Sequence, residues 1–246
     1  MVIDLNADIG EGFAADRELL ELITSASVAC GGHAGDITTM RTTAELAAER
    51  GVTLGAHPGY PDRESFGRAE ISAPAADIER WVREQVQTFT EVCSSLGVRV
   101  RYVKAHGALY NRAWRDEETA AAIAAAVRTV DATLVLLGPP DSAMLAAARD
   151  AGLGTAREAF LDRGYAADGT LVPRGEPDAL VTDAAAAGER ALAIARGQEV
   201  RSTDGMCLSI RAESVCVHGD SPHAVALMRA ARKRLLDAGI EPAPFA

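Results

Sequence analysis

Short apolar runs alternate with longer amphipathic segments along the whole chain. The short runs have the length and composition of buried strands, whereas the longer segments repeat their apolar positions every three or four residues, as helices do. The expected strands are Val2 to Ala7, Ser25 to Cys30, Thr53 to Ala56, Val100 to Ala105, Thr133 to Leu137, Thr155 to Phe160 and Ser214 to Val217. This alternation predicts a protein built from consecutive β-α units.

Residues typical of helix ends mark the segments between these strands. Asp36 is expected to cap a helix over residues 37–50, and Gly51 is expected to end it. The buried face of this helix is expected to carry Ile37, Met40, Ala44 and Ala47. Other helix starts are expected at Pro74, Asp116, Asp141 and the pair Ser221-Pro222.

Strands that alternate with helices lie parallel, because each connection crosses back over the sheet in the right-handed sense. The fold is therefore an open doubly wound α/β sheet or a closed (β/α) barrel, and a count of about seven units is one short of a standard barrel. No linker rich in glycine or serine divides the chain, so residues 1–246 are expected to form a single domain. Residues 161–178 are expected to form a functional loop over one end, and residues 206–211 a short extra strand.

The 246 residues carry a formal charge of -10, which argues against nucleic acid as a partner, because phosphate backbones are bound through clustered Lys and Arg. The basic run at residues 229–234 lies on the expected C-terminal helix and is interpreted as a solvated face. No targeting segment or membrane-spanning stretch is present, so a cytoplasmic protein without a membrane partner is expected. Reduced, buried thiols are expected at the widely spaced Cys30, Cys93, Cys207 and Cys216.

Four of the five histidines stand at or just beyond the expected end of a strand, each with a glycine within two residues. They are His33, His57, His106 and His218. The carboxyl ends of parallel strands share one face, where ligands bind. One histidine at such a position is usually a turn residue, but independent turns have no reason to choose histidine over Asn, Asp or Ser. The four imidazoles are therefore predicted to converge on one rim.

Charged residues also stand near the expected ends of the strands. The carboxylates are Asp8, Glu11, Asp36, Asp62, Glu158, Asp162 and Asp220. With neutral imidazoles such groups bind a divalent metal or orient a histidine as a general base, although Asp36 is equally suited to cap a helix. Lys104 lies in an apolar strand end, where an ammonium requires a carboxylate or an anionic ligand. Loop arginines that could hold a carboxylate or phosphate are Arg63, Arg68, Arg163 and Arg174.

Six blocks of sequence resemble the LamB/YcsF family, whose members form the A subunit of prokaryotic ATP-dependent 5-oxoprolinase. The blocks are DLNADIGEGF (4–13), ITSASVACGGHAGD (23–36), GVTLGAHPGYPDRESFGR (51–68), YVKAHGALYN (102–111), EAFLDRGYAADGTLVPR (158–174) and VCVHGDSP (215–222). They stand in the family's order and span nearly the whole chain. The chain departs from the family pattern at Gly32, where a bulky aromatic residue is usual, at Ala105, where proline is usual, and at residues 12–14, where Gly-Phe-Ala replaces Ser-Phe-Gly.

The resemblance implies a seven-stranded (β/α) barrel, similar to that of polysaccharide deacetylases, and a reaction in which 5-oxo-L-proline, ATP and water give L-glutamate, ADP and phosphate. It also implies partner subunits B and C. A five-membered lactam is a resonance-stabilised amide with a poor leaving group, so phosphorylation of the amide oxygen by ATP would make its carbon attackable. The chain lacks the G-x-x-x-x-G-K-[ST] motif, so ATP binds elsewhere in this chain or at a subunit interface.

For this reaction the expected catalytic residues are Asp8, His33, His57, His106 and Glu158. Substrate contacts are expected from Asn6, Lys104, Asp162, Arg163, His218 and Asp220. One imidazole-carboxylate pair would activate water or assist proton transfer to the ring nitrogen, while Lys104 and Arg163 would stabilise the developing oxyanion or phosphate. The expected cofactors are ATP as co-substrate and a divalent ion, either Mg²⁺ with ATP or an ion bound in the site. An ion in the site would be held by Asp8, His33 and His57.

Two other functions stay open. A metal-dependent amidohydrolase or deacetylase that acts without ATP is the main alternative, because the clustered Asp and His residues permit it. A tightly held metal with ATP-independent hydrolysis would favour this alternative. A third interpretation is a binding module that holds a small acid for a partner, which ligand binding without turnover would favour even when subunits B and C are supplied.

Overall fold

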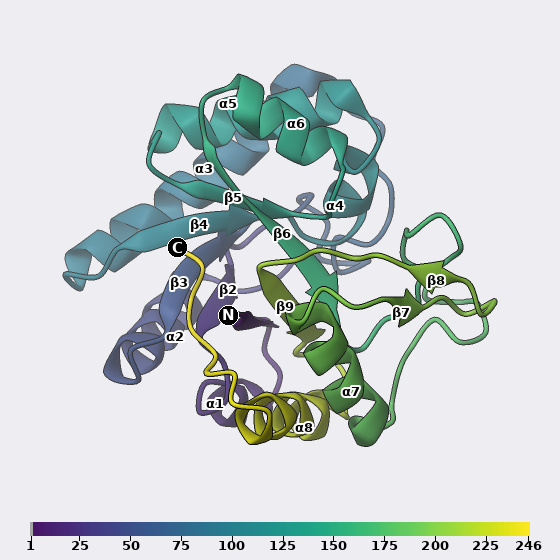
Figure 1. The fold of residues 1–246 in the computed structure, drawn as a ribbon. Helices are drawn as coiled ribbons and strands as arrows, with labels where there is room; N and C mark the ends of the chain where they lie inside the picture. The colour runs from purple at the N-terminus through teal and green to yellow at the C-terminus, as the bar shows by residue number, and fades with distance from the viewer. Residues whose placement is uncertain (1) are drawn as a thin grey trace.

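Seven parallel strands close into a barrel in the order β1-β2-β3-β4-β5-β6-β9 in the computed structural model, which describes residues 2–246 (Figure 1). The barrel strands are β1 (Asp4–Ile9), β2 (Ser25–Ala29), β3 (Thr53–His57), β4 (Val100–Lys104), β5 (Val135–Gly138), β6 (Gly154–Phe160) and β9 (Ser214–His218). Strand β9 pairs with both β6 and β1, and its His218 lies opposite Asp8. The predicted barrel is therefore confirmed, and the alternative of an open sheet is wrong.

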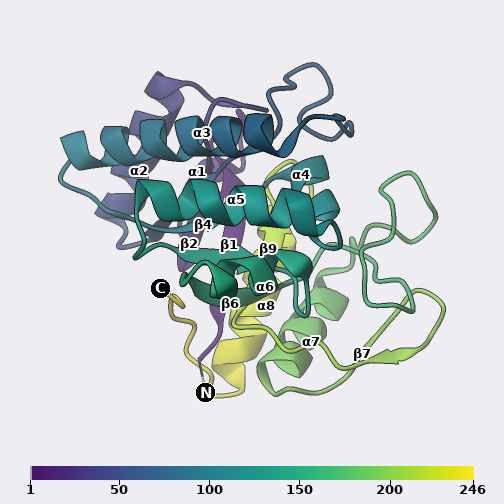
Figure 2. The ribbon, with the colours of Figure 1, turned by 90° about the horizontal axis from the view of Figure 1, so that it is seen from above.

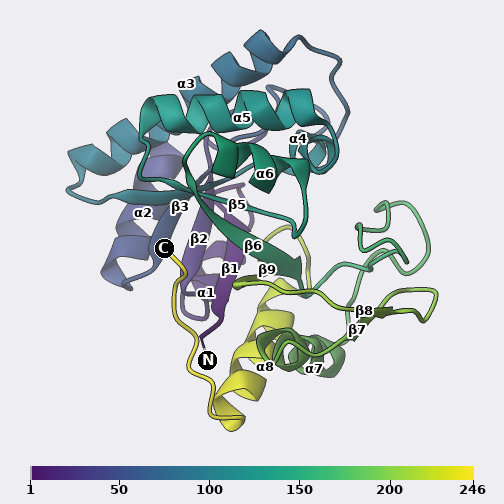
Figure 3. The same ribbon diagram turned by 45° about the horizontal axis from the view of Figure 1, so that its top comes forward.

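Helices surround the barrel and bury their apolar stripes against the outer face of its strands (Figure 2). The helices are α1 (Asp16–Leu19), α2 (Ile37–Glu49), α3 (Ala75–Ser95), α4 (Gly107–Ala113), α5 (Glu117–Val130), α6 (Ala143–Asp150), α7 (Ala184–Ala195) and α8 (Ala224–Asp237). Helices α3, α5 and α6 lie side by side on one flank, and α7 packs on α8 (Figure 3). Across residues 2–246, no helix combines the length and the apolar composition needed to cross a membrane.

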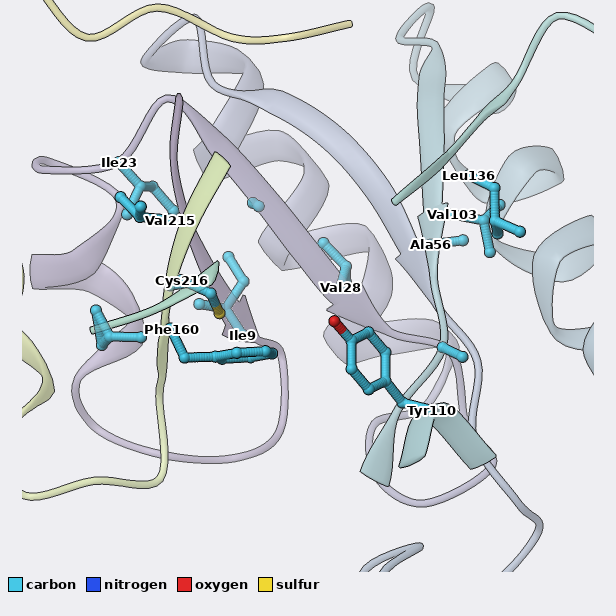
Figure 4. Packing of buried hydrophobic residues seen from close by; sticks show 14 of the residues in the cluster. Ile9, Ile23, Val28, Ala56, Val103, Tyr110, Leu136, Phe160, Val215 and Cys216 are labelled. Atoms are coloured by element: carbon cyan, nitrogen blue, oxygen red, sulfur yellow. The ribbon is translucent and has the colours of Figure 1, made fainter. Parts of the chain in front are cut away.

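Side chains of the barrel strands point alternately toward the helices and toward the barrel axis. On β1, Ile9 belongs to the apolar layer between strands and helices, part of which is seen at close range in Figure 4. Asn6 and Asp8 of the same strand instead contact Glu158 and Lys104 across the barrel. The barrel interior is therefore largely polar, and the main apolar core lies outside the strands.

The C-terminal segment crosses the end of the barrel at which the strands begin (Figure 1). The backbone N–H of Ala243 donates to the carbonyl of Ile3 at 3.1 Å. The ring of Phe245 packs edge-on against Tyr102, with the ring centroids 5.0 Å apart, and Leu137 is buried beside Tyr102. Apolar and aromatic side chains thus close this end, which leaves the carboxyl ends of the strands as the open side.

The observed barrel strands differ from the predicted ranges by at most two residues at either end, but three details of the helices are wrong. Ser142 rather than Asp141 caps α6, because its hydroxyl accepts a backbone N–H of the first turn, while Asp141 has a left-handed φ of 53°. Ile37 is 60% exposed, because the first turn of α2 borders a surface hollow. Helix α8 begins at Ala224, since Ser221-Pro222 form a preceding turn.

Strands β7 (Val200–Arg201) and β8 (Cys207–Leu208) form an antiparallel hairpin that projects from the barrel (Figure 3). The expected extra strand within residues 206–211 is therefore present, outside the barrel. Cys207 is exposed, so the prediction that it is buried is wrong; this projecting hairpin leaves its side chain uncovered. The buried free thiols are Cys30, Cys93 and Cys216, as predicted.

Candidate functional site

A cavity of about 460 Å³ opens at the carboxyl ends of the barrel strands, and we call it the barrel cavity. The charged and polar side chains that line it include Asp8, His57, Lys104, His106, Tyr110, His218, Arg68, Arg163 and Arg174. The predicted loop over residues 161–178 forms one wall, through residues 170–174. A volume of this size suits a small molecule.

Three of the four predicted histidines meet at one side of this cavity. The rings of His33 and His106 are stacked, with centroids 3.6 Å apart and an interplanar angle of 3°. His57 stands edge-on to both rings, and its Nε2 lies 3.0 Å from Nδ1 of His106. The Oε1 atom of Glu11 lies 3.0 Å from Nε2 of His33 and 3.5 Å from Nδ1 of His106. We call Glu11 and these three histidines the histidine cluster.

Two glycines leave space for the stacked rings of His33 and His106, and a glutamine side chain binds the backbone of one of these glycines. A Cβ atom at Gly59 would lie 2.9 Å from Nδ1 of His33, and one at Gly67 would lie 2.8 Å from its Cβ. Gln85 of α3 donates to the carbonyl of Gly59 at 2.8 Å and accepts its N–H at 3.1 Å. A Cβ at Gly32 would lie 2.3 Å from Oε1 of Gln85, so the space that a larger residue would need at position 32 is taken by this glutamine.

Backbone carbonyls fix the proton positions of two rings in the histidine cluster. Nδ1 of His57 lies 2.8 Å from the carbonyl oxygen of Lys104, and Nε2 of His106 lies 2.9 Å from that of Phe66. A carbonyl only accepts hydrogen bonds, so these two nitrogens carry the ring protons. In the neutral rings, the lone pairs of His57 Nε2 and His106 Nδ1 therefore face the interior of the cluster.

A buried chain of charges links the histidine cluster to the barrel interior. Nζ of Lys104 lies 2.7 Å from Oδ1 of Asp8 and 2.8 Å from Oε1 of Glu158. Glu158 also accepts from Asn6 Nδ2 at 3.0 Å and from the Tyr110 hydroxyl at 3.1 Å. Burial acts to lower the pKa of Lys104, but the two carboxylates outweigh it and hold that pKa well above its usual range. The ammonium is thus charged and shared between two carboxylates.

Burial and neighbouring charges shift the pKa values of Asp8 and Glu11 in opposite directions. Burial raises the pKa of Asp8, but the nearby His57 and Lys104 outweigh it and hold that pKa well below its usual range. Burial and the charge of Asp8 instead raise the pKa of Glu11 well above its usual range. Burial, together with His57, lowers the pKa of His33 to about 2. Asp8 is therefore the fixed anion at this end of the barrel, beside a neutral His33.

His218 is oriented by a buried carboxylate. Its Nδ1 lies 3.0 Å from Oδ2 of Asp162, and its backbone N–H donates to the same oxygen at 3.0 Å. Its ring stacks on Phe160, with centroids 5.3 Å apart, and its Nε2 lies 4.0 Å from Oδ2 of Asp8. Burial acts to raise the pKa of Asp162, but His218 outweighs it and the pKa is lowered. Asp162 thus holds the imidazole with Nε2 directed toward Asp8 in the cavity.

Arginines give the cavity rim a positive charge. Arg68 and Arg174 lie 2.5 Å and 3.5 Å from Oδ2 of the same residue, Asp220, so two guanidinium groups share one carboxylate. Arg163 is buried and donates to two backbone carbonyls at 3.2 Å and 2.6 Å, which ties the loop wall together. Burial lowers the pKa of Arg163 to about 10. Arg68 and Arg174 are therefore the rim cations with capacity for an anionic ligand.

The structure brings the predicted site residues to the carboxyl end of the barrel or directly beneath it. Those that line the barrel cavity are Asp8, His57, Lys104, His106, Arg163 and His218. His33, Glu158 and Asp162 contact these residues directly. Asn6 donates to Glu158 below the cavity, and Asp220 binds Arg68 at its rim. Asp36 instead caps α2 by accepting the N–H of Thr39, the other role considered for it.

Two residues of the site are not singled out by the sequence pattern. Glu11 stands there only as one of several carboxylates, although its position three residues after Asp8 in a glycine-rich strand end is a usable signal. Tyr110 lies on α4, four residues after His106, which is the N-cap residue of that helix, but the sequence pattern does not predict this helix. Helix α4 is short and begins directly after the strand end, so its apolar pattern merges with that of β4.

A closed parallel barrel with a cavity of histidines and carboxylates at its strand ends defines the class of this protein: a (β/α) barrel with an enzyme-type site. Residues 3–246 match the LamB/YcsF family. The chain belongs to this family. It is 48% identical to the A subunit of 5-oxoprolinase from Streptomyces avermitilis over 250 residues, which cover 100% of both chains.

A solved structure of a relative has the same fold. The lactam utilization protein from Thermus thermophilus is 39% identical, covers 100% of both chains and superposes with a TM-score of 0.93. Deacetylase barrels are also among the structural neighbours. The peptidoglycan deacetylase PdaC from Bacillus subtilis is 10% identical with a TM-score of 0.48, over 98% of this chain and 86% of that one.

Proposed function

We propose that this chain provides the lactam site of an ATP-dependent 5-oxoprolinase that opens 5-oxo-L-proline to L-glutamate. The names of its relatives support this assignment, since one is the A subunit of a 5-oxoprolinase and another a lactam utilization protein. The observation that carries the proposal is the barrel cavity, which places His57, His106 and His218 around Asp8 beneath a rim of arginines. This arrangement combines groups for proton transfer with cations for an anionic substrate.

The carboxylate of 5-oxoproline is proposed to bind at the rim. Arg68 and Arg174 share the single carboxylate of Asp220, so their combined charge exceeds that of their partner by one. A guanidinium group binds a carboxylate through paired N–H donors, which also fixes its orientation. Binding at the rim directs the lactam ring toward the strand ends and therefore toward His218 and Asp8.

The ring opening needs an activated amide, a base and a proton for the leaving nitrogen. Transfer of the γ-phosphoryl group of ATP to the amide oxygen releases ADP and makes the ring carbon electrophilic. One water then adds to this carbon, and cleavage of the C–N bond, with a proton delivered to the nitrogen, gives the acyl phosphate of glutamate. A second water cleaves the acyl phosphate to glutamate and phosphate.

His218 is the residue best placed to take the proton from the attacking water. Asp162 holds its Nδ1, so Nε2 is directed into the cavity, an arrangement that general bases share. Lys104 contributes by keeping Asp8 ionised and in place, because its ammonium bridges Asp8 and Glu158 rather than projecting freely into the cavity. The expected oxyanion role of Lys104 and Arg163 stays a prediction.

Partner subunits complete the proposed enzyme. The relative from Streptomyces avermitilis is named as one subunit of its enzyme, and this chain has no P-loop motif, so we propose that subunits B and C take part in phosphorylation with ATP and Mg²⁺. Because ATP is the proposed co-substrate, we propose a cytoplasmic location.

The test is 5-oxoproline-dependent ATP hydrolysis, measured for this chain alone and with subunits B and C. Coupled release of ADP and glutamate by the complete set is expected, and His218→Gln should reduce it by about 100-fold or more, in the range of general-base loss. His223→Gln is the matched control, because His223 is exposed on the last turn before α8. Lactam hydrolysis without ATP would contradict the proposal and favour a metal-dependent amidohydrolase, and binding without turnover would favour a binding module.

A further inference from the structure

The histidine cluster contains more lone pairs than protons. Nε2 of His57 and Nδ1 of His106 are 3.0 Å apart, and both ring protons lie on the far nitrogens, where they are donated to backbone carbonyls. Two neutral nitrogens facing each other at this distance repel, because each presents a lone pair. Glu11 adds an oxygen 3.5 Å from Nδ1 of His106, and Asp8 adds one 3.4 Å from Nε2 of His57. A positive charge at this point would satisfy all these atoms.

The spacing of the atoms fits a metal ion. One nitrogen each from His33, His57 and His106 and one oxygen of Glu11 all lie within 4.8 Å of one another. Ligands at about 2.0 to 2.1 Å from a tetrahedral ion are about 3.3 Å apart. The cluster shows separations of 3.0 Å, 3.0 Å and 3.5 Å between neighbouring ligand atoms. A single shared proton would bridge only one of these contacts.

The supporting contacts also fit a metal site. Metal-bound histidines usually donate their second ring N–H to a carbonyl or carboxylate, which fixes the ring. His57 and His106 both do so, through the carbonyls of Lys104 and Phe66. Three imidazole nitrogens with one carboxylate oxygen suit zinc and similar first-row ions, whereas magnesium and calcium prefer oxygen ligands alone.

We infer that Glu11, His33, His57 and His106 bind one divalent ion of the zinc type at the side of the barrel cavity. The ligand set differs from the one expected from sequence, in which Asp8 took part, because the four ligand atoms that lie within 4.8 Å of one another come from Glu11 and the three histidines. His57 and His106 line the cavity, so the ion lies within reach of a bound ligand. The inference rests on the geometry of the cluster and does not depend on the proposed reaction.

The experiment is metal binding to the purified full chain, without lactam, ATP or partner subunits, so that it succeeds or fails independently of the proposed function. The protein is stripped with a chelator, dialysed against Zn²⁺ or Co²⁺, and its metal content measured. One equivalent of either ion is expected, and the Co²⁺ form should show the intense visible absorption of a four-coordinate site.

Three variants and one control variant locate the ion. Glu11→Gln and His106→Asn should weaken Zn²⁺ binding by more than the roughly 10- to 100-fold that loss of a supporting hydrogen bond costs. Asp8→Asn should weaken it by less than about 10-fold, since Asp8 is placed outside the ligand set. His223→Gln, an exposed histidine, should bind as the unchanged chain does.

Two outcomes would overturn the inference. The first is a stripped and reloaded chain that holds less than about a tenth of an equivalent and gives no visible Co²⁺ spectrum, which would assign a shared proton to the cluster. The second is unchanged affinity in folded Glu11→Gln and His106→Asn. Far-ultraviolet circular dichroism checks folding, and if either variant does not fold, the Co²⁺ spectrum of the unchanged chain decides.

Discussion

Replacing Lys104 with methionine isolates the contribution of the buried ammonium. Lys104 is 2% exposed, and its Nζ lies 2.7 Å and 2.8 Å from the carboxylates of Asp8 and Glu158. Methionine retains a long unbranched side chain of similar volume, so the substitution removes the charge without opening a large cavity. What remains is a pair of buried carboxylates without the cation between them.

The expected loss of stability follows from these distances. At an effective dielectric constant of about 20, each contact near 2.7 Å amounts to roughly 6 kcal/mol of Coulomb attraction, most of which is offset by the cost of burying the charges. Removing one partner of such a buried pair destabilises a protein by about 3 to 5 kcal/mol. For a chain of this size this corresponds to a fall in Tm on the order of 10 °C.

Urea denaturation at pH 7, followed by circular dichroism, measures the effect. The matched variant combines Lys104→Met with Glu158→Gln. The second substitution removes the charge of one of the two carboxylates that have lost their cation. The double variant should recover about 1 to 3 kcal/mol relative to Lys104→Met, because one uncompensated charge is gone. A loss below about 1 kcal/mol for Lys104→Met, or strict additivity of the two substitutions, would refute the reasoning.

Three further predictions concern groups outside the histidine cluster. Burial raises the pKa of Asp4 from its ordinary value of 3.8 to about 6, so its contribution to stability is full below about pH 4 and falls by about 3 kcal/mol as the pH rises from about 4 through 6. Asp4→Asn should remove this fall in urea denaturations between pH 4 and 8, and parallel pH profiles would contradict it. Gln85→Ala should cost about 2 to 3 kcal/mol in the same assay, because the N–H and carbonyl of Gly59 lose their partner; a cost below about 0.5 kcal/mol would argue against this clamp. Tyr110→Phe removes a hydrogen bond to a charged carboxylate and should lower stability by about 1.5 to 3 kcal/mol, whereas an unchanged thermal midpoint would show that the bond contributes nothing.

The fold and the convergence of the histidines could be predicted because both follow from local patterns. Alternating strands and helices imply a parallel sheet, and parallel strands place their carboxyl ends on one side. His57, His106 and His218 stand at those ends and line one cavity, as expected. The prediction needed only the position of each histidine relative to its own strand.

Partners across the barrel could not be predicted in the same way. The sequence indicated that Lys104 needs a carboxylate or an anionic ligand, but it left that choice open. The structure shows two carboxylates, from strands separated by many residues in the chain. Arg163 likewise stood among the loop arginines suited to an anion, whereas its guanidinium group binds backbone carbonyls of its own loop. The Lys104 contacts depend on how far each strand is shifted against its neighbour when the barrel closes, and the Arg163 contacts depend on how its loop folds back on itself.

Strand β1 shows how the pairing of neighbouring strands fixes the positions of the site residues. Asp4, Asn6 and Asp8 alternate with apolar residues, so the pattern alone places all three on one face. Closure of β9 against β1 then puts Asp8 opposite His218 and Asn6 opposite Cys216. A shift of one residue in this pairing would turn the polar side chains toward the helices, where each would be buried without a partner. The polar interior therefore both specifies the register of the barrel and sets the positions of the groups in its cavity.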